Sequence, residues 1–341
     1  MIKIEKKEWK FVFLVWLAVN FIIFFPFFFG EIITPKDKIF LGMQGLNRVD
    51  TPYYYSLIEQ VKDGKFLFKY NSTPEPHPHF IFDPFWLAVG ILAKLFNLSS
   101  ISTFQLAKFL VIPFFLISSY FFISFFFKEP RARKWAFLIL IFGSGWGWLF
   151  IYFLDLIPGM RVKGAIELAD FVDEKGVLQF PIDLWVPEAF SFLSLYNSPH
   201  FGFSVSLIFL IFLFSLLFFE SEKPKYSLLA GIFCTILFQF HPYYIPTIFV
   251  VLGIFILILF AKRKGGFHYL AHYFVLLIFS LFPTLYHLWA IIKIPVRTSH
   301  FQKNILITPS LPYLLIGYGS LIFFGLLGLL SLLKKKARIS F

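Results

Sequence analysis

The chain has 341 residues, of which 58% are hydrophobic and 53 are phenylalanine. This composition lies far outside the range of soluble globular domains and excludes an ordinary soluble enzyme or binding module. Lys and Arg outnumber Asp and Glu by 31 to 19, which gives a net charge of +12. Because most of the excess lies in short clusters beside apolar stretches, it indicates membrane topology and no binding of nucleic acid.

Long apolar stretches dominate the chain. A transmembrane helix needs about 20 apolar residues. In chain order, the stretches predicted to span a membrane are 11–29, 104–127, 135–154, 203–219, 227–240, 243–261, 269–290 and 312–333. A further stretch, 80–96, is shorter and contains Asp83-Pro84 and Lys94, so we predict a partial or interfacial helix there. The predicted fold is an all-α polytopic membrane protein with about eight transmembrane helices, one partial or interfacial helix and two large outer loops.

Loop charge predicts the orientation of these spans. Basic clusters lie at Lys3–Lys10, 128–134, 262–264 and 334–338, and the positive-inside rule places all of them, with the N-terminus, in the cytoplasm. The acids lie elsewhere, six of the 19 in the first outer loop, 31–79, and seven in the second, 155–199. Only one full crossing fits between an outer first loop and a cytoplasmic 128–134. Either the charge rule fails once or 80–96 is an interfacial or re-entrant helix, and its shortness favours the second.

The domain organisation and location follow from the same pattern. Residues 1–341 are predicted to form a single multi-pass domain in a plasma or cytoplasmic membrane, with its polar groups on the outer face. Since the chain ends abruptly after Lys334-Lys335-Lys336, the domain could be truncated at its C-terminus and continue in a longer protein.

The first outer loop contains a predicted amphipathic helix. Asp50-Thr51-Pro52 is typical of a helix start, Leu57, Ile58 and Val61 share one face, and Gly64 ends the segment. Asp50 either only caps this helix or is also a carboxylate that takes a proton from an acceptor hydroxyl. The two roles are compatible, because a cap fixes the position of the carboxylate.

Two histidines and two tyrosines in this loop are candidate substrate-binding residues. His77-Pro78-His79 has spacing that allows a shared metal, but no cysteine or tight carboxylate cluster completes such a site. Hydrogen bonds from these histidines to a phosphate, a sugar or a backbone carbonyl are the favoured interpretation. Tyr53 and Tyr54 either stack on a sugar ring or serve a structural purpose.

Residues 1–130 resemble the integral-membrane glycosyltransferases of the GT-C superfamily, which includes protein O-mannosyltransferases and aminoarabinose transferases. The resemblance rests on one span, an outer loop with Asp50 followed by Tyr53-Tyr54, an amphipathic helix ending at Lys62-Asp63-Gly64, and then His77-Pro78-His79-Phe80. It implies a polyprenyl-phosphate sugar donor, chemistry on the outer face and Asp50 as the catalytic carboxylate. Many members carry two adjacent acids in this loop, whereas residue 49 is Val here.

A second acid is expected from the second outer loop. Among its acids we favour Asp155 and Glu188, because they lie nearest the predicted span ends. His200 begins one span and His241 interrupts the apolar run between two others. Polar groups at membrane depth are functional candidates, although an interhelical histidine or a tight turn explains His241 equally well. Both histidines and the first loop are predicted on the outer side, so they could face one cavity.

Basic residues in segment 291–311 run against the charge rule. Lys293, Arg297 and Lys303 lie there without an acid. A guanidinium binds phosphate in bidentate fashion, so Arg297, with Arg48, is a candidate for the donor phosphate. The alternative is that these cations reach lipid headgroups.

The sequence therefore favours a glycosyltransferase that moves a sugar from a polyprenyl-phosphate donor to a glycan, lipid or protein acceptor, with inversion and with Asp50 as general base. Membrane lipids are expected partners, and Mg²⁺ or Mn²⁺ is a possible cofactor. Two alternatives stand beside this interpretation: a transporter or flippase for a lipid-linked sugar, and a non-catalytic subunit derived from the same fold.

Overall fold

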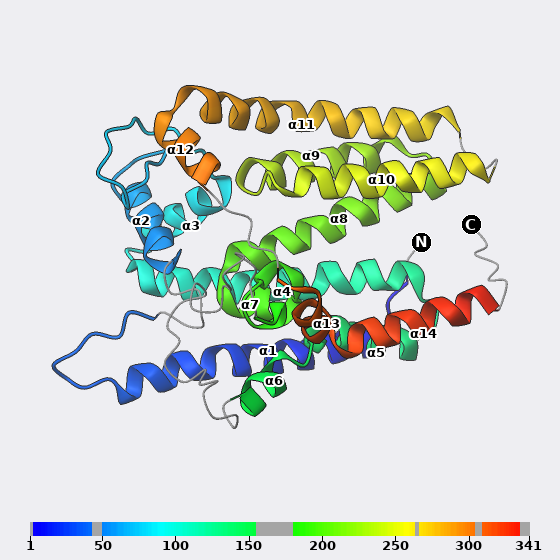
Figure 1. Ribbon diagram of the computed structural model, residues 1–341, viewed down its shortest axis with the longest axis horizontal. Helices are drawn as coiled ribbons and strands as arrows, with labels where there is room; N and C mark the ends of the chain where they lie inside the picture. Colours follow the sequence, from blue (N-terminus) through cyan, green and yellow to red (C-terminus); the bar gives the residue numbers. More distant parts are fainter. Residues whose placement is uncertain (1–2, 43–49, 155–179, 263–265, 304–308, 335–341) are drawn as a thin grey trace.

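The computed structural model describes residues 3–42, 50–154, 180–262, 266–303 and 309–334, which form a helical bundle (Figure 1). These residues contain no β-strand, and one antiparallel bridge joins Phe68 to Ile81. The helices are α1 (Lys6–Ile33), α2 (Asp50–Lys62), α3 (Pro84–Leu95), α4 (Ser100–Phe126), α5 (Pro130–Phe142), α6 (Gly147–Leu154), α7 (Ser191–Asn197), α8 (Pro199–Ser221), α9 (Pro224–Phe240), α10 (Tyr244–Ala261), α11 (Phe267–Lys293), α12 (Pro295–Lys303), α13 (Leu311–Tyr318) and α14 (Ser320–Lys334).

The helical membrane fold agrees with the sequence prediction, whereas the count of eight spans is not confirmed. In the part of the chain that the structure describes, α1, α4, α8, α10 and α11 are long and apolar enough to cross a membrane. A sixth span results if α13 and α14, which meet at an angle of 77°, are counted together. Helix α9 has 17 residues and is shorter than these spans.

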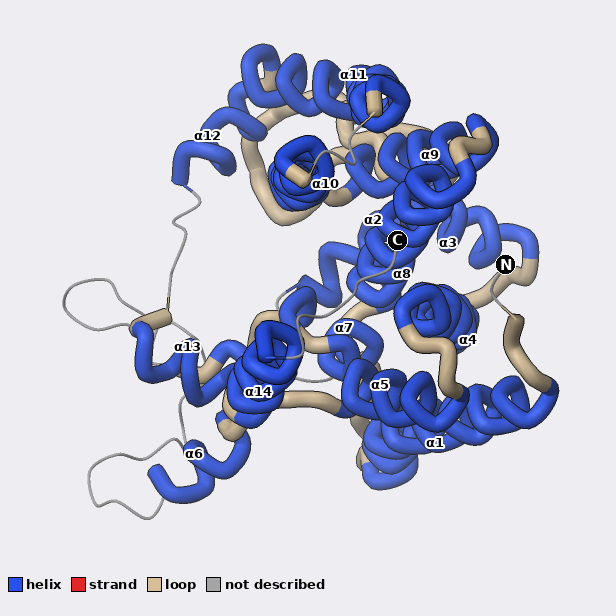
Figure 2. The backbone as a smooth tube through the Cα atoms, turned by 90° about the vertical axis from the view of Figure 1, so that its right-hand side faces the viewer, coloured by secondary structure: helices blue, strands red, loops and turns tan. Residues whose placement is uncertain are grey.

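Two of the expected spans are interrupted where they pack on each other. Stretch 135–154 is not one helix, because α5 ends at Phe142 and α6 begins at Gly147. In the break, the Trp146 amide donates to the Ile316 carbonyl at 2.9 Å. The chain of the last stretch also turns at Gly319, which has a positive φ of 45° and separates α13 from α14. Figure 2 shows α6 and α13 beside each other, on the side of the bundle away from α11.

Glycine is required at this contact. A Cβ atom on Gly145 would lie 1.8 Å from the Gly317 carbonyl oxygen, so the two backbones touch only without a side chain. We expect Gly145→Ala to destabilise the protein by about 1–3 kcal/mol through overpacking, visible as a lower melting temperature in detergent. Gly325→Ala is the matched control, because a Cβ there meets nothing within 4 Å. Equal melting temperatures for the two variants would contradict this packing.

Helix α2 and the turn that follows it fold as the sequence predicts for residues 50–64. Leu57, Ile58 and Val61 are buried along one face of α2. The chain leaves the helix through Gly64, whose φ is +84° and whose amide donates to the Val61 carbonyl at 2.8 Å. Glycine reaches this left-handed conformation without steric cost, which explains where the helix stops.

Helix α3 packs on α2 and is too short to span. Its 12 residues extend about 18 Å, well below a hydrocarbon core of about 30 Å. Gly90 of α3 lies directly against Val61 of α2. Both helices lie where α1 ends and α4 begins (Figure 1). Stretch 80–96 is therefore a partial helix, in agreement with the sequence prediction.

The two ends of the bundle differ in chemistry. One end, on the right in Figure 1, holds the start of α1, the α4–α5, α8–α9 and α10–α11 connections and the end of α14. The described residues of all the basic clusters lie there, and we call it the basic end. The opposite end holds α2, α3, α12 and the α9–α10 turn, and we call it the site end. The structure thus places the basic clusters at the end of the bundle opposite α2, α3 and α12.

Candidate functional site

Asp50 is the first residue of α2 and is half-buried. A carboxylate in the first turn of a helix is stabilised by the unpaired backbone N–H groups and the helix dipole. The buried apolar face of α2 fixes the helix on the bundle and so fixes this carboxylate at the site end. Arg48, the other predicted residue in this segment, lies outside the described residues.

A stack of aromatic rings lies beside Asp50. The ring of Tyr54 stacks on Trp86 at 4.9 Å and 13°, and Trp86 stacks on Phe104 at 5.9 Å and 11°. The His200 ring lies 4.6 Å from that of Tyr54. Tyr54 is buried, and this burial raises the pKa of its hydroxyl well above its usual value. Its ring therefore joins α2 to α3, α4 and α8 and supports the site from within.

A chain of hydrogen bonds connects His200 and His241 to the carboxylate of Glu188. Ser204 Oγ donates to the His200 carbonyl at 2.7 Å and lies 3.0 Å from His241 Nδ1. The Tyr243 hydroxyl donates to Glu188 Oε1 at 3.0 Å and lies 2.9 Å from the same His241 Nδ1. Since both hydroxyls already donate elsewhere, His241 Nδ1 must carry the proton and donate to them. The neutral tautomer then leaves His241 Nε2 as an acceptor.

Glu188 is the second acid that the structure brings to this site. It lies in a 3₁₀ turn, Pro187–Ala189, and is half-buried. Burial raises the pKa of its carboxyl, and the negative charge of nearby Asp50 raises it further. A carboxyl whose pKa is raised by burial and by a neighbouring carboxylate is a common feature of functional sites. Asp155, the other favoured acid, lies outside the described residues.

Arg297 reaches the same region from α12. Its Nη1 donates to the Tyr70 hydroxyl at 2.7 Å, and the Tyr70 ring lies 6.0 Å from that of Tyr53. Burial raises the pKa of Tyr53, and the charges of Arg297 and Asp50 act on it in opposite directions. Tyr53 therefore lies within electrostatic range of both the Arg297 guanidinium, from α12, and the Asp50 carboxylate, from α2.

His77 serves the loop that contains it. Its Nδ1 lies 2.7 Å from the Glu75 carbonyl, and its Nε2 accepts from the Tyr70 amide at 3.0 Å. Both ring nitrogens are thus used within the loop, which places Tyr70 opposite Arg297. His79 is half-buried nearby. Within the described residues, no group of three or more His, Cys, Asp or Glu side chains is placed to hold a metal ion.

Asp83 is a residue of this site that sequence reasoning interpreted only as a helix interruption. Its Oδ1 accepts from the Trp86 amide at 3.0 Å, so it caps α3. Its charge also acts on Tyr53 and Tyr54. Burial raises the pKa of Asp83 to about 7 from an ordinary value of 3.8. Its position directly after the His-Pro-His segment was the available signal.

This shift predicts a pH-dependent stability. Between about pH 4 and pH 7 folded Asp83 binds more protons than unfolded Asp83, so stability falls as pH rises through this window. Asp83→Asn keeps an acceptor for the Trp86 amide and removes the charge. We expect the variant to lose less melting temperature between pH 5 and pH 8 than the wild type loses. An identical pH dependence would exclude this role.

Lys108 is a second residue near the site that the sequence analysis did not single out. It is 1% exposed within α4, its Nζ donates to the Tyr196 carbonyl at 2.7 Å, and it lies 5.2 Å from the centre of the Phe104 ring. A lysine inside a predicted span was the available signal, because buried cations in spans require partners. Here the cation ties α4 to α7, directly behind the aromatic stack.

Comparison with known proteins finds no family model that matches this sequence, no similar curated protein and no similar solved structure.

Proposed function

We propose that the protein is a membrane glycosyltransferase that moves a sugar from a polyprenyl-phosphate donor to an acceptor at the site end. The observation that carries this proposal is the convergence of Asp50, Glu188, His241 and Arg297. They come from four separate segments: Tyr243 joins His241 to Glu188, the charge of Asp50 acts on Glu188, and the charges of Asp50 and Arg297 both act on Tyr53. Helices α2 and α12, which carry Asp50 and Arg297, lie at the end of the bundle opposite the basic clusters. By the positive-inside rule the site end is the outer face.

The proposed reaction is a single inverting displacement. Asp50 takes the proton of the acceptor hydroxyl, whose oxygen attacks the anomeric carbon. The bond from that carbon to the phosphate oxygen breaks, and its electron pair leaves with the lipid phosphate. Arg297 faces the negative charge that develops there. General-base assistance contributes roughly 10²–10⁴-fold, and electrostatic stabilisation of the leaving group is usually the larger contribution.

Two neighbouring carboxylates would also attract a divalent cation. Mg²⁺ is commonly held by one or two carboxylates together with the phosphate of a substrate, and Asp50 with Glu188 supplies that number. A bound cation would neutralise charge on the donor phosphate. The Tyr243 hydroxyl, held between His241 and Glu188, would keep the Glu188 side chain oriented in either case.

The experiment that tests the proposal is sugar transfer by the purified full chain. Radiolabelled polyprenyl-phosphate sugars are supplied with membrane acceptors, with and without Mg²⁺ or Mn²⁺. Transfer of label identifies an enzyme. Movement of intact donor across liposomes without transfer would identify a flippase instead. Neither activity, in a folded preparation and with every donor, would favour a non-catalytic subunit.

Arg297 gives a prediction on donor binding. We expect Arg297→Gln to raise KM for the donor roughly tenfold or more, because a charge-assisted contact to phosphate is lost. Lys293→Gln is the matched control, because Lys293 is an exposed cation four residues earlier, at the end of α11, and it should leave KM unchanged. An unchanged KM in Arg297→Gln would exclude Arg297 from the donor site.

A further inference from the structure

A groove runs along the outside of α4 and α8, far from the candidate site. It encloses about 380 Å³, and Tyr226 of α9 closes one side. Its lining from α4 is Phe114, Ile117, Ser118 and Phe121, and its lining from α8 is Leu210, Leu213, Phe214 and Leu217. On each helix these residues recur at intervals of three and four, so each helix contributes one face.

The groove continues into a polar pocket of about 480 Å³ at the basic end. Leu217 lines both. Ser124 of α4 and Glu220 of α8 each lie three residues beyond the last groove residue of their helix, and therefore on the same faces. Phe114 precedes Ser124 by ten residues, or about 15 Å along the helix. That is roughly half of a hydrocarbon core and matches one leaflet.

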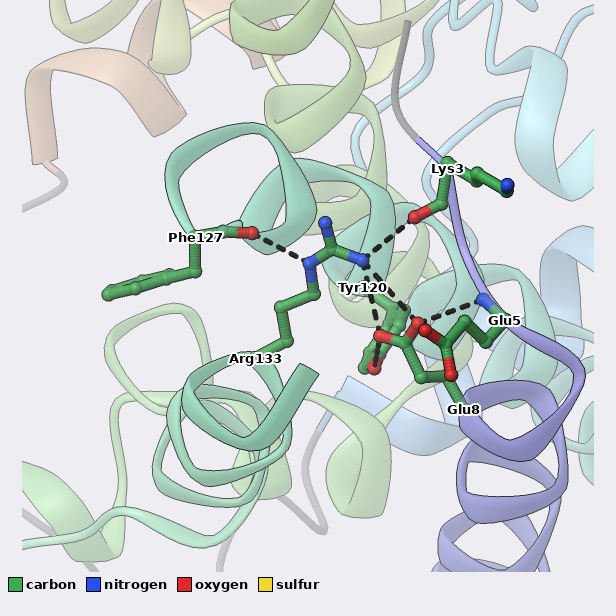
Figure 3. A network of polar contacts seen from close by, with 6 residues as sticks. All are labelled: Lys3, Glu5, Glu8, Tyr120, Phe127 and Arg133. Atoms are coloured by element: carbon green, nitrogen blue, oxygen red, sulfur yellow. Dashed lines mark hydrogen bonds and ion pairs between the residues drawn. The ribbon is translucent and has the colours of Figure 1, made fainter. Parts of the chain in front are cut away.

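The charges around this pocket are balanced. Arg133 and Glu8 lie 3.3 Å apart, and Arg133 also donates to the carbonyls of Phe127 and Lys3 (Figure 3). This pair neutralises itself. The other charged residues of the lining are Lys3, Lys128, Glu5 and Glu220. None of these four side chains forms an ion pair within the described residues. The Glu5 carboxylate also caps the first turn of α1, which leaves part of its hydrogen-bonding capacity, with Glu220 and the two lysines, for a ligand.

A buried hydroxyl adds a second, independent observation. Ser124 is 5% exposed and lines the pocket, and its Oγ has no hydrogen-bond partner among the residues that the structure describes. A buried hydroxyl without a partner costs free energy. A ligand that places an oxygen in the pocket would satisfy it.

We propose that the groove and the pocket together bind one phospholipid of the leaflet at the basic end, with a headgroup that carries a phosphate and a primary ammonium. The phosphate lies between Lys3 and Lys128, and the ammonium donates to Glu220 and Glu5. One acyl chain occupies the groove between α4 and α8. A headgroup without an ammonium leaves two carboxylates beside its phosphate, and a choline headgroup has no N–H to donate to them.

The test is native mass spectrometry of the purified full chain, incubated with equal amounts of dioleoyl phosphatidylethanolamine, phosphatidylcholine and phosphatidylglycerol. We expect one phosphatidylethanolamine per chain, retained roughly fivefold over either competitor, since one charge-assisted contact to a partly exposed site is at stake. Lys128→Gln should lower its retention about fivefold by the same reasoning. Lys262→Gln, at the same end and outside the pocket, should leave retention unchanged.

The acyl groove is tested separately. Ile117, 41% exposed, lines the groove, and Ile117→Trp should fill it and reduce retention. Ile278→Trp on α11 is the control, because Ile278 is 64% exposed at a position outside the groove. Equal retention of all three lipids, preference for phosphatidylglycerol, or unchanged retention in both Lys128→Gln and Ile117→Trp would overturn the proposal. Lys128 is exposed, so its variant decides the question if Ile117→Trp does not fold.

Discussion

Replacing Asp50 with Asn is expected to lower the rate of sugar transfer by about 10³-fold or more. Asparagine has nearly the same shape and cannot accept a proton at neutral pH, so the variant removes general-base assistance and the negative charge together. The apolar face of α2 does not involve this residue, and the fold should persist. The measurement is the initial rate at saturating donor and acceptor.

Asp63→Asn is the matched control for this experiment. Asp63 is exposed and directly follows α2, outside the candidate site. Its replacement by Asn therefore removes the same charge as Asp50→Asn without changing the site. We expect its rate to equal that of the wild type. A rate for Asp50→Asn within a few fold of the wild type would remove the assignment of Asp50, and an equal loss in both variants would point to charge alone.

Replacing Arg133 with Met is expected to cause the largest loss of stability, about 3–5 kcal/mol. Glu8 is 1% exposed, and its partners are Arg133, the Tyr120 hydroxyl, which donates at 2.7 Å, and the Glu5 amide, which donates at 2.8 Å. Without the arginine, a buried carboxylate remains with no cation beside it. The measurement is the melting temperature in detergent, compared with Arg131→Met, since Arg131 is exposed on the same helix.

The double variant Glu8→Leu with Arg133→Met distinguishes a broken ion pair from lost packing. Because no buried charge remains, its melting temperature should lie closer to that of the wild type than the single variant's does. If the double variant melts as low as or lower than Arg133→Met, then the arginine stabilises the fold through its contacts with the Phe127 and Lys3 carbonyls and not through Glu8.

Much of the fold could be predicted because local signals and packing agree. The start of α2 at Asp50, its end before Gly64 and its buried face follow from capping, glycine and apolar spacing. The short α3 follows from Asp83-Pro84 and loop charge. The breaks near Gly145 and Gly319 carry only a weak local signal, Gly143-Ser144-Gly145 and Gly317-Tyr318-Gly319, because glycine is also frequent inside transmembrane helices. Their cause is a backbone contact between segments more than 170 residues apart.

The sequence could suggest which residues belong to the candidate site, but it could not predict how their side chains are arranged in space. Membrane depth marked His200 and His241, and their rings lie 5.1 Å apart. Proximity to a span favoured Glu188, and the structure brings it near Asp50. His77 was expected to bind substrate, but both of its ring nitrogens contact backbone groups of its own loop. The Tyr243 hydroxyl also contacts His241 and donates to Glu188, 55 residues earlier in the sequence, and no local pattern encodes such a bond.

The measurement that tests the central claim most directly is transfer of radiolabelled sugar from polyprenyl-phosphate donors, with wild type and Asp50→Asn assayed side by side. Both proteins are first shown to have the same melting temperature. The structure and chemistry described above predict transfer by the wild type and essentially none by the variant. Undiminished transfer by the variant, or no transfer by folded wild type with any donor, would contradict a glycosyltransferase that uses Asp50 as its base.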